Sequence, residues 1–246
     1  MSSPAGASVV RRRLLWHLAR ASRWTAILAC VVLVGVVGFS FAGAAGPQTP
    51  DLARQASLGA AAQPVGRPRS PHVGIVAGHW GNDSGAVCAD GLTEQAVNFD
   101  VARRVVELLM ARRYRVDLLQ EFDPRLSGYA ADALVSIHAD SCEFINEIAT
   151  GFKVARSAAS FEPETEDRLV GCLIERFGAA TGLGFHENSI TSDMTSYHNF
   201  SEVAPDTPAA IIEVGFLYLD RPILTGQPDR VAQGIAEGIV CFVESP

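Results

Sequence analysis

The chain has 246 residues and a formal net charge of −7, which is divided unevenly along it. Residues 1–70 carry eight arginines and one acid, whereas residues 71–246 carry twelve basic and twenty-six acidic residues, so a segment of charge +7 precedes one of charge −14. A content of 48% hydrophobic and 19% charged residues excludes a disordered, collagenous or small disulfide-rich protein. We expect no nucleic-acid partner, because the acidic segment has a single lysine, Lys153, and lacks the basic surface that phosphates require.

The first element in chain order is an apolar run at residues 24–45, which follows a basic leader at residues 1–23. The run holds no charged residue over twenty-two positions. As a helix rising about 1.5 Å per residue, it would cross a hydrocarbon core of about 30 Å. The five arginines before it favour a cytoplasmic N-terminus and export of everything after residue 45. We therefore predict a transmembrane helix; the alternative, a buried core helix, fits poorly with so long a run without polar breaks.

The same run ends in a cleavage motif, since Ala42-Gly43-Ala44 has the small-x-small pattern of a signal peptidase site. The run is longer than a usual signal-peptide core, which favours an uncleaved signal-anchor and a single-pass membrane protein. Secretion after cleavage near Ala44 is the alternative. Residues 46–70 are rich in Pro, Ala, Gly and Ser and are expected to form a flexible linker.

Residues 71–246 alternate between strand and helix patterns and are numerous enough for one domain with its own core. Strands are expected at 72–77, 116–119, 133–137, 151–155 and 209–214, and helices at 93–111, 165–180 and 228–242. Strands that are apolar throughout and separated by helices favour a parallel sheet with both faces covered. We predict a single three-layer α/β domain, in which a mainly parallel, twisted sheet is covered by helices on both faces.

Polar residues stand at the carboxyl ends of three predicted strands. His79 and His138 follow two of them closely, and Glu213 interrupts the apolar sequence of a third. In open α/β sheets, ligands bind in the crevice outside the carboxyl ends of the strands. Glu94, in the first turn of the helix after the first strand, opens toward the same crevice. We expect these four side chains to meet at one edge of the sheet.

Two histidines and a carboxylate form a typical zinc set, with a fourth position left for water. We assign His79, Glu94 and His138 to one zinc ion and Glu213 to proton transfer, because a glutamate near zinc-activated water can take and then deliver the proton. Each residue also has a structural explanation: a lone histidine is commonly only hydrogen-bonded, and a first-turn glutamate complements the helix dipole. Glu213 resists that explanation most, because burying an unpaired carboxylate in an apolar strand is costly.

The cysteines are relevant to the cellular compartment of the protein and to possible disulfide bonds. Cys88, Cys142, Cys172 and Cys241 follow the apolar run, and outside the cytoplasm four thiols allow three disulfide pairings. They could equally be buried, unpaired small hydrophobes. The absence of a Cys-x-x-Cys motif makes a thiolate metal site or a redox motif a poor explanation.

Five short segments contain or surround these residues. They are AGHWGNDSGA at 77–86, LTEQAVN at 92–98, ALVSIHAD at 133–140, GFKV at 151–154 and AIIEVGFL at 210–217. Together and in this order they resemble the zinc-dependent N-acetylmuramoyl-L-alanine amidases, whose most specific segment is Ser-Ile-His-Ala-Asn. The resemblance extends from about residue 73 to residue 243.

This resemblance implies zinc bound by His79, Glu94 and His138, with Glu213 as the catalytic carboxylate. It also implies hydrolysis of the amide that joins N-acetylmuramic acid to L-alanine, and therefore a peptidoglycan substrate. A body outside the cytoplasm, anchored in the bacterial cell membrane through residues 24–45, agrees with that substrate.

The segments depart from the family's pattern at several positions. Val76-Ala77 replaces its Asp-Pro, Trp80 replaces a glycine, Tyr218-Leu219 replaces Ser-Asn, and residues 120–133 lack its Arg-rich helix. These departures leave the precise substrate open. A zinc peptidase or deacylase acting on a different amide is one alternative, and a non-catalytic wall-binding domain of the same fold is another.

One further stretch, residues 181–207, is rich in Gly, Ser, Thr and Asn and contains His186, Asp193 and His198. It could form a lid or a substrate-side loop. We expect its polar residues to be solvated loop residues instead.

Overall fold

The computed structural model describes residues 69–245. Its strands are β1 (His72–Ala77), β2 (Arg115–Leu119), β3 (Ala133–Asp140), β4 (Lys153–Ala155) and β5 (Ala209–Phe216). Its long helices are α2 (Glu94–Ala111), α3 (Pro163–Thr181) and α7 (Pro228–Glu244). Short helical segments are η1 (Pro124–Leu126), η2 (Glu187–Ser189), α4 (Ser192–Thr195), α5 (Asn199–Glu202) and α6 (Arg221–Gly226).

The predicted leader, membrane segment and nearly all of the predicted linker lie outside the described residues. Within residues 69–245, none of the helices combines the length and the apolar character needed to cross a membrane.

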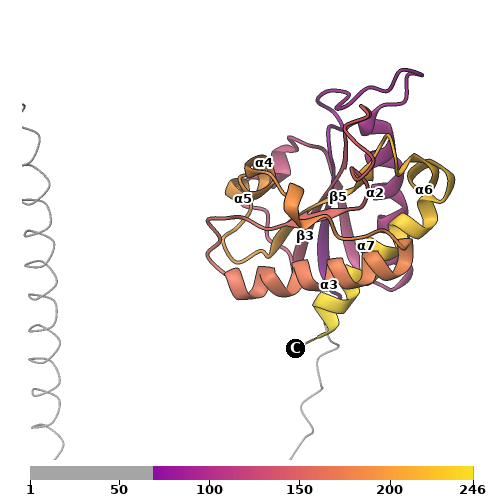
Figure 1. The fold of residues 1–246 in the computed structure, drawn as a ribbon. Helices are drawn as coiled ribbons and strands as arrows, with labels where there is room; N and C mark the ends of the chain where they lie inside the picture. The colour runs from indigo at the N-terminus through magenta and orange to yellow at the C-terminus, as the bar shows by residue number, and fades with distance from the viewer. Residues whose placement is uncertain (1–68, 246) are drawn as a thin grey trace, which may run out of the picture. The chain divides into compact units, whose positions relative to one another are not determined.

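One five-stranded sheet organises the domain, in the order β2-β1-β3-β5-β4. The first four strands in this order run parallel, and the short β4 pairs antiparallel with β5 at the edge. Figure 1 shows β3 and β5 at the centre of the domain, with α3 lying alongside them. The prediction of a single α/β domain with a mainly parallel sheet is confirmed.

The apolar strands form because both faces of the sheet are covered. All six residues of β1 and the first seven of β3 are buried, so these strands need no alternation of polar and apolar residues. Ile75, Val135 and Ile212 belong to the main core together with Val101 of α2 and Leu173 of α3. Each such side chain contributes roughly 1.5–3 kcal/mol on full burial.

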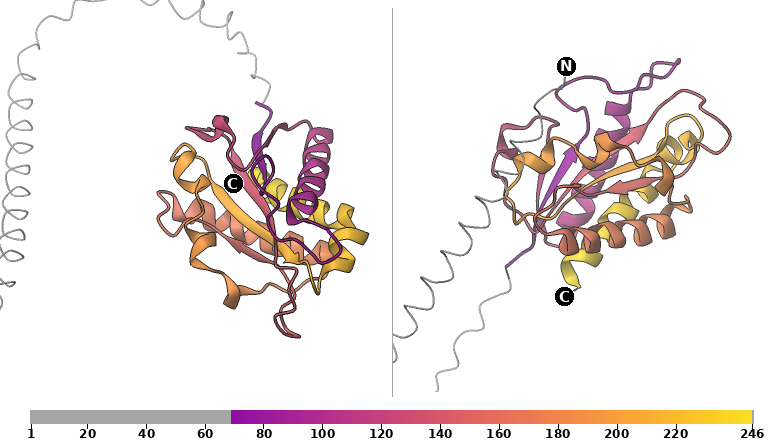
Figure 2. Two further views of the ribbon diagram at one scale, coloured as in Figure 1. Left: turned by 90° about the horizontal axis from the view of Figure 1, so that it is seen from above. Right: turned by 60° about the vertical axis from the view of Figure 1, so that its left-hand side comes forward.

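The two faces of the sheet are covered differently. On one face α7 packs against both α2 and α3. The other face carries η1, α4, α5 and their loops, packed through a smaller core that includes Leu126, Tyr129 and Phe200. Figure 2 (left) shows these short helices on the opposite side of the sheet from α2. The predicted helical layer on the second face is therefore made of single turns, because residues 120–132 and 182–208 contain no long amphipathic run.

Every predicted strand and helix of the body forms, with ends within three residues of those expected. The largest difference is in β3, which continues to Asp140 instead of ending at Ile137. His138 therefore lies inside the strand, where it is the register neighbour of Glu213 in β5.

Two disulfide bonds select one of the three pairings that the sequence left open. Cys88–Cys142 joins the loop before α2 to the segment after β3. Cys172–Cys241 joins α3 to α7. The alternative of four unpaired cysteines was wrong.

Candidate metal centre

The turn after β1 brings His79 to the carboxyl edge of the sheet. The Gly78 N–H donates to Ile137 O over 2.9 Å, which continues the strand ladder one residue beyond β1. A Cβ at Gly78 would lie 2.5 Å from the His138 ring, so this close approach requires glycine. His79 itself has a left-handed φ of 65°, uncommon for a residue with a side chain. The rings of His79 and His138 end with their centroids 5.0 Å apart.

Glu94, the first residue of α2, meets both histidines. Its Oε1 lies 3.2 Å from His79 Nε2 and 3.2 Å from His138 Nδ1. The backbone N–H groups of Ala86 and Ala139 also donate to its carboxylate, over 3.1 and 3.2 Å. Burial acts to raise the pKa of Glu94, but hydrogen bonds from the two histidines lower it overall. Glu94 is therefore ionised at neutral pH.

The spacing of these three side chains fits a zinc ion. One ligand atom from each of His79, Glu94 and His138 lies within 4.8 Å of the other two. Tetrahedral zinc with bond lengths of about 2.0–2.2 Å places neighbouring nitrogen and oxygen ligands about 3.3 Å apart. Both 3.2 Å separations at Glu94 Oε1 match that distance. The predicted ligand residues are thus brought together with the donor types and the spacing that zinc prefers.

Each histidine also has a polar partner on the ring nitrogen that faces away from this cluster. His79 Nδ1 lies 2.6 Å from Asp83 Oδ1. His138 Nε2 lies 3.2 Å from the Tyr197 hydroxyl and 3.5 Å from Glu121 Oε2. Partners of this kind fix the tautomer and orientation of a metal-ligating imidazole. When each ring is neutral, the nitrogen that faces Glu94 carries no proton and can bind a cation instead of donating to Glu94.

Glu213 lies beside the cluster as the register neighbour of both His138 and Lys153. Its Oε2 is shielded from solvent and has no hydrogen-bond partner among residues 69–245. Burial raises the pKa of Glu213 to about 7, although the charge of His138 acts to lower it. A carboxyl group with this pKa can accept and release a proton near neutral pH.

Three further side chains at this centre were not predicted from the sequence: Glu121, Tyr197 and His198. Glu121 accepts hydrogen bonds from the backbone N–H of His79 and from the Tyr197 hydroxyl, each over 2.7 Å. It stands two residues after β2, so the rule that selected polar residues at strand ends would have found it. Tyr197 had no comparable signal, because it lies between two single-turn helices. His198 was noted only as one of the polar residues of the stretch 181–207.

The expectation that the polar residues of 181–207 are solvated is wrong for His198. Its Nε2 lies 3.0 Å from Glu121 Oε1, and its ring stacks on Phe122 with centroids 4.2 Å apart. Asp193, by contrast, is exposed as expected. The short helices α4 and α5 hold this part of the connection against the centre.

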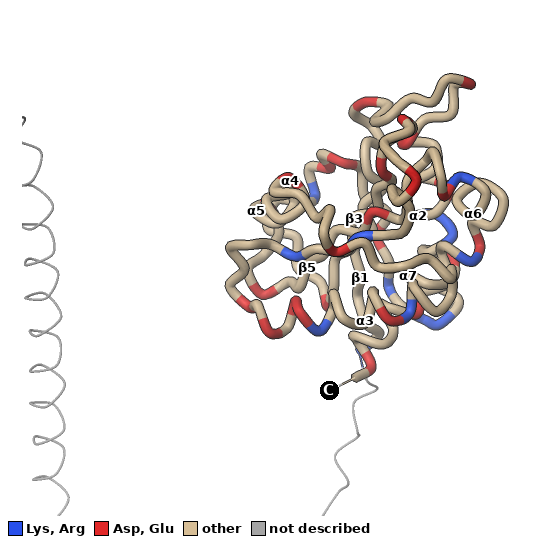
Figure 3. Tube along the Cα trace, in the orientation of Figure 1, with Lys and Arg blue, Asp and Glu red and all other residues tan. Residues whose placement is uncertain are grey.

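Acidic residues prevail around the end of the domain where these loops gather. Figure 3 shows more red than blue positions in the upper part of the tube, beyond the labels β3 and α2. Within the centre, Asp83, Glu94 and Glu121 add three carboxylates. A concentration of negative charge at one edge attracts cations, which is what a metal centre requires.

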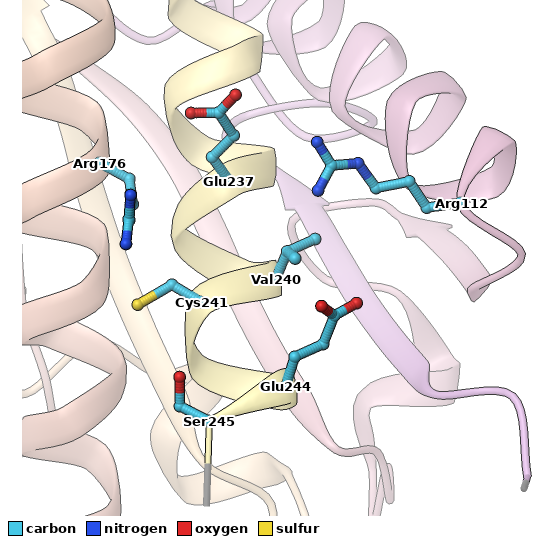
Figure 4. A pocket seen from close by; sticks show the side chains of 7 residues that line it. All are labelled: Arg112, Arg176, Glu237, Val240, Cys241, Glu244 and Ser245. Atoms are coloured by element: carbon cyan, nitrogen blue, oxygen red, sulfur yellow. The ribbon is translucent and has the colours of Figure 1, made fainter.

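A separate cleft lies far from this centre, between α2, α3 and α7 (Figure 4). It has a volume of about 360 Å³ and is lined by Arg112, Arg176, Glu237, Val240, Cys241, Glu244 and Ser245. The cleft opens near the C-terminal end of α2, whereas Glu94 is the first residue of that helix. Because α2 has 18 residues, its two ends are about 27 Å apart. The cleft shares no residue with the metal centre, and we assign it no chemistry.

A cluster of two histidines and one glutamate, beside a carboxyl group of pKa about 7, has the composition of a metal-dependent hydrolase centre. The sequence profile of the N-acetylmuramoyl-L-alanine amidase family, Amidase_3, matches residues 73–241. The chain belongs to this family and is an N-acetylmuramoyl-L-alanine amidase, which confirms the predicted family and enzyme class. A search of curated proteins found no match.

Solved structures show the same fold. The amidase Ami1 of Mycobacterium smegmatis is 19% identical, with a TM-score of 0.57, over 72% of this chain and 98% of that one. An N-acetylmuramoyl-L-alanine amidase of Clostridium difficile 630 is 22% identical, with a TM-score of 0.56, over 72% and 98%. AmiC2 of Nostoc punctiforme is 22% identical, with a TM-score of 0.56, over 71% and 98%.

Proposed function

We propose that this amidase cleaves the bond between N-acetylmuramic acid and L-alanine in peptidoglycan with one zinc ion held by His79, Glu94 and His138. The observation that carries the proposal is the 3.2 Å spacing of the candidate ligand atoms beside Glu213, whose buried Oε2 has no hydrogen-bond partner among residues 69–245. Zinc in such a site supplies Lewis acidity, which polarises a carbonyl and lowers the pKa of water.

The protein's own proton carrier in this proposal is Glu213. Its carboxylate takes a proton from the attacking water, whose remaining hydroxide bonds to the amide carbon. When the carbon–nitrogen bond breaks, Glu213 delivers the proton to the amino nitrogen of L-alanine, so it is unchanged at the end. A pKa of about 7 suits both steps, because the group must be a base first and an acid afterwards.

The test is to purify the full-length chain, measure its bound zinc and identify by mass the products released from peptidoglycan. We expect one zinc per chain and free stem peptides that begin with L-alanine. Glu213→Ala should retain zinc and lose about 10²-fold or more in rate. Glu166→Gln is the matched control, because Glu166 is a buried glutamate of α3 outside the centre.

Two outcomes would contradict the proposal. Cleavage elsewhere in the stem would indicate a peptidase, and the absence of turnover in a zinc-loaded wild-type chain would indicate a wall-binding domain. Full activity of Glu213→Ala would remove Glu213 from the mechanism.

We also propose that residues 1–23 remain in the cytoplasm, residues 24–45 anchor the chain in the membrane, and residues 46–70 tether a catalytic domain at 71–246 outside it. The two disulfides support this arrangement, because disulfides persist in oxidising compartments outside the cytoplasm. The substrate class supports it as well, since peptidoglycan lies outside the membrane.

The topology is tested by sequencing the N-terminus of the mature protein and by adding a protease to intact cells. An anchored protein begins at residue 1 and loses its domain to the protease. A mature N-terminus near residue 45 would show cleavage and secretion instead.

A further inference from the structure

One carboxylate, that of Glu121, contacts both histidines of the metal centre. Its Oε2 accepts the backbone N–H of His79 over 2.7 Å and lies 3.5 Å from His138 Nε2. Glu121 is 5% exposed, so solvent does not weaken these interactions. His79 lies in the turn after β1, His138 lies in β3, and Glu121 follows the end of β2.

The second oxygen of this carboxylate is held as well. Oε1 accepts the Tyr197 hydroxyl over 2.7 Å and lies 3.0 Å from His198 Nε2. His198 is held in turn by Glu202, whose Oε1 lies 2.8 Å from its Nδ1. With both oxygens engaged, the carboxylate of Glu121 cannot rotate without losing hydrogen bonds. The connection 182–208 therefore fixes Glu121 in place.

Glu121 is not placed to bind the metal directly. His138 turns Nδ1 toward Glu94 and Nε2 toward Glu121, and the two nitrogens of an imidazole point away from each other. Glu121 thus lies behind the ring, as seen from the cluster of ligand atoms. Glu121 can therefore affect a cation bound by the ligand atoms only indirectly, through the two histidines.

We infer that Glu121 is a positioning residue, which holds His79 in its left-handed backbone conformation and His138 in the orientation that presents Nδ1 to the metal. This inference rests on the proposed zinc site. A left-handed φ such as the 65° of His79 is strained for a residue with a side chain and persists only where surrounding contacts impose it. The hydrogen bond from the His79 N–H to Glu121 is one of those contacts. A carboxylate on the outer nitrogen of His138 also makes that ligand more basic.

The experiment compares zinc affinity in the full-length wild type, Glu121→Gln and Glu121→Asp by competition with a chelator. We expect Glu121→Gln to bind zinc about 10–100-fold more weakly and to change the visible absorption of the Co²⁺-substituted protein. Glu121→Asp keeps the negative charge on a shorter side chain, so its zinc affinity should lie between those of the wild type and Glu121→Gln. Hydrolysis by Glu121→Gln at saturating zinc should show a lower kcat with little change in KM. Glu166→Gln, also a buried glutamate, should match the wild type in every measurement.

Tyr197→Phe provides a second test that does not depend on the folding of Glu121→Gln. It keeps the ring but deletes the hydroxyl that donates to Glu121 Oε1 and lies 3.2 Å from His138 Nε2, so zinc affinity should fall in the same direction by a smaller factor. Unchanged zinc affinity and an unchanged Co²⁺ spectrum in these variants, beside a zinc-binding wild type, would overturn this inference alone. A wild-type chain that binds no zinc would overturn the proposed zinc site and this inference with it.

Discussion

Glu213, the proposed proton carrier, shows how burial at a single residue raises the pKa of a carboxyl group toward neutral pH. Its carboxyl group lies in an otherwise apolar strand, and burial raises its pKa to about 7. Lys153, on the neighbouring β4, acts in the opposite direction and lowers that pKa. Lys153 is itself 4% exposed and paired with Asp140.

A pH dependence follows from this balance. Glu213 must be ionised to accept a proton, so kcat/KM should fall about tenfold per pH unit below the pKa of Glu213. That pKa is about 7 without a metal ion, and a bound cation lowers it. Lys153→Met should move this acidic limb to higher pH, because it removes a positive charge and leaves Asp140 unpaired. The check is the pH–rate profile of both proteins at saturating zinc, and an unmoved limb would contradict the assignment of Glu213.

Two glycines offer a matched test of the ligand cluster. Gly85 and Gly91 both have positive φ, 58° and 86°, so alanine at either costs about 1–2 kcal/mol in backbone strain. A Cβ at Gly85 would lie 2.5 Å from Glu94 Oε2 and 2.7 Å from the His79 ring, whereas at Gly91 nothing lies within 4 Å. We expect both variants to lose stability through backbone strain, Gly85→Ala more because of this clash, and we expect a loss of zinc affinity from Gly85→Ala alone. Urea unfolding and chelator competition measure the two effects separately, and equal zinc affinities would contradict the placement of Glu94.

At the scale of elements, the two disulfides close loops of similar length but connect different parts of the domain. Cys88–Cys142 ties the loop between His79 and Glu94 to the segment after β3. Cys172–Cys241 cross-links α3 and α7.

Their removal should therefore separate stability from metal binding. With separations of 54 and 69 residues, each disulfide should contribute about 2–4 kcal/mol, and the two should differ by only about 0.2 kcal/mol in chain entropy. Replacing Cys88 and Cys142 by serine should also weaken zinc binding, whereas replacing Cys172 and Cys241 should not. Zinc titration of both double variants at a temperature where each is folded decides this, and equal affinities would show that the first disulfide does not hold the centre.

The long elements were predictable because their patterns are local. The spacing of Val97, Val101 and Val105 marks α2, and all three are buried against the core. The second face of the sheet was not predictable in this way, since α4 and α5 are single turns whose place depends on packing of Met194, Tyr197 and Phe200 with Ile211 of β5. Such segments lack the repeated periodicity on which sequence patterns depend.

At the scale of the whole molecule, the charge of residues 71–246 opposes binding to an anionic cell wall. The domain carries −14, and acidic positions prevail over basic ones in its loops at the sheet edge (Figure 3). Added salt shortens the Debye length from about 30 Å at 0.01 M to about 8 Å at 0.15 M.

The rate of hydrolysis of intact peptidoglycan should therefore rise with sodium chloride over this range. A small uncharged fragment with the same amide bond serves as the control and should show little dependence on salt. Initial rates on the two substrates check this, and a rate on intact peptidoglycan that falls with salt would show that local basic residues outweigh the net charge.

The sequence by itself determined that His79, Glu94, His138 and Glu213 would meet, because the carboxyl ends of parallel strands converge on one edge whatever the loops do. Only the tertiary structure decided the pairing of the cysteines and the position of Tyr197, 76 residues from Glu121 along the chain. Contacts of that kind depend on how the connecting segments pack against the sheet. No local pattern of residues records that packing.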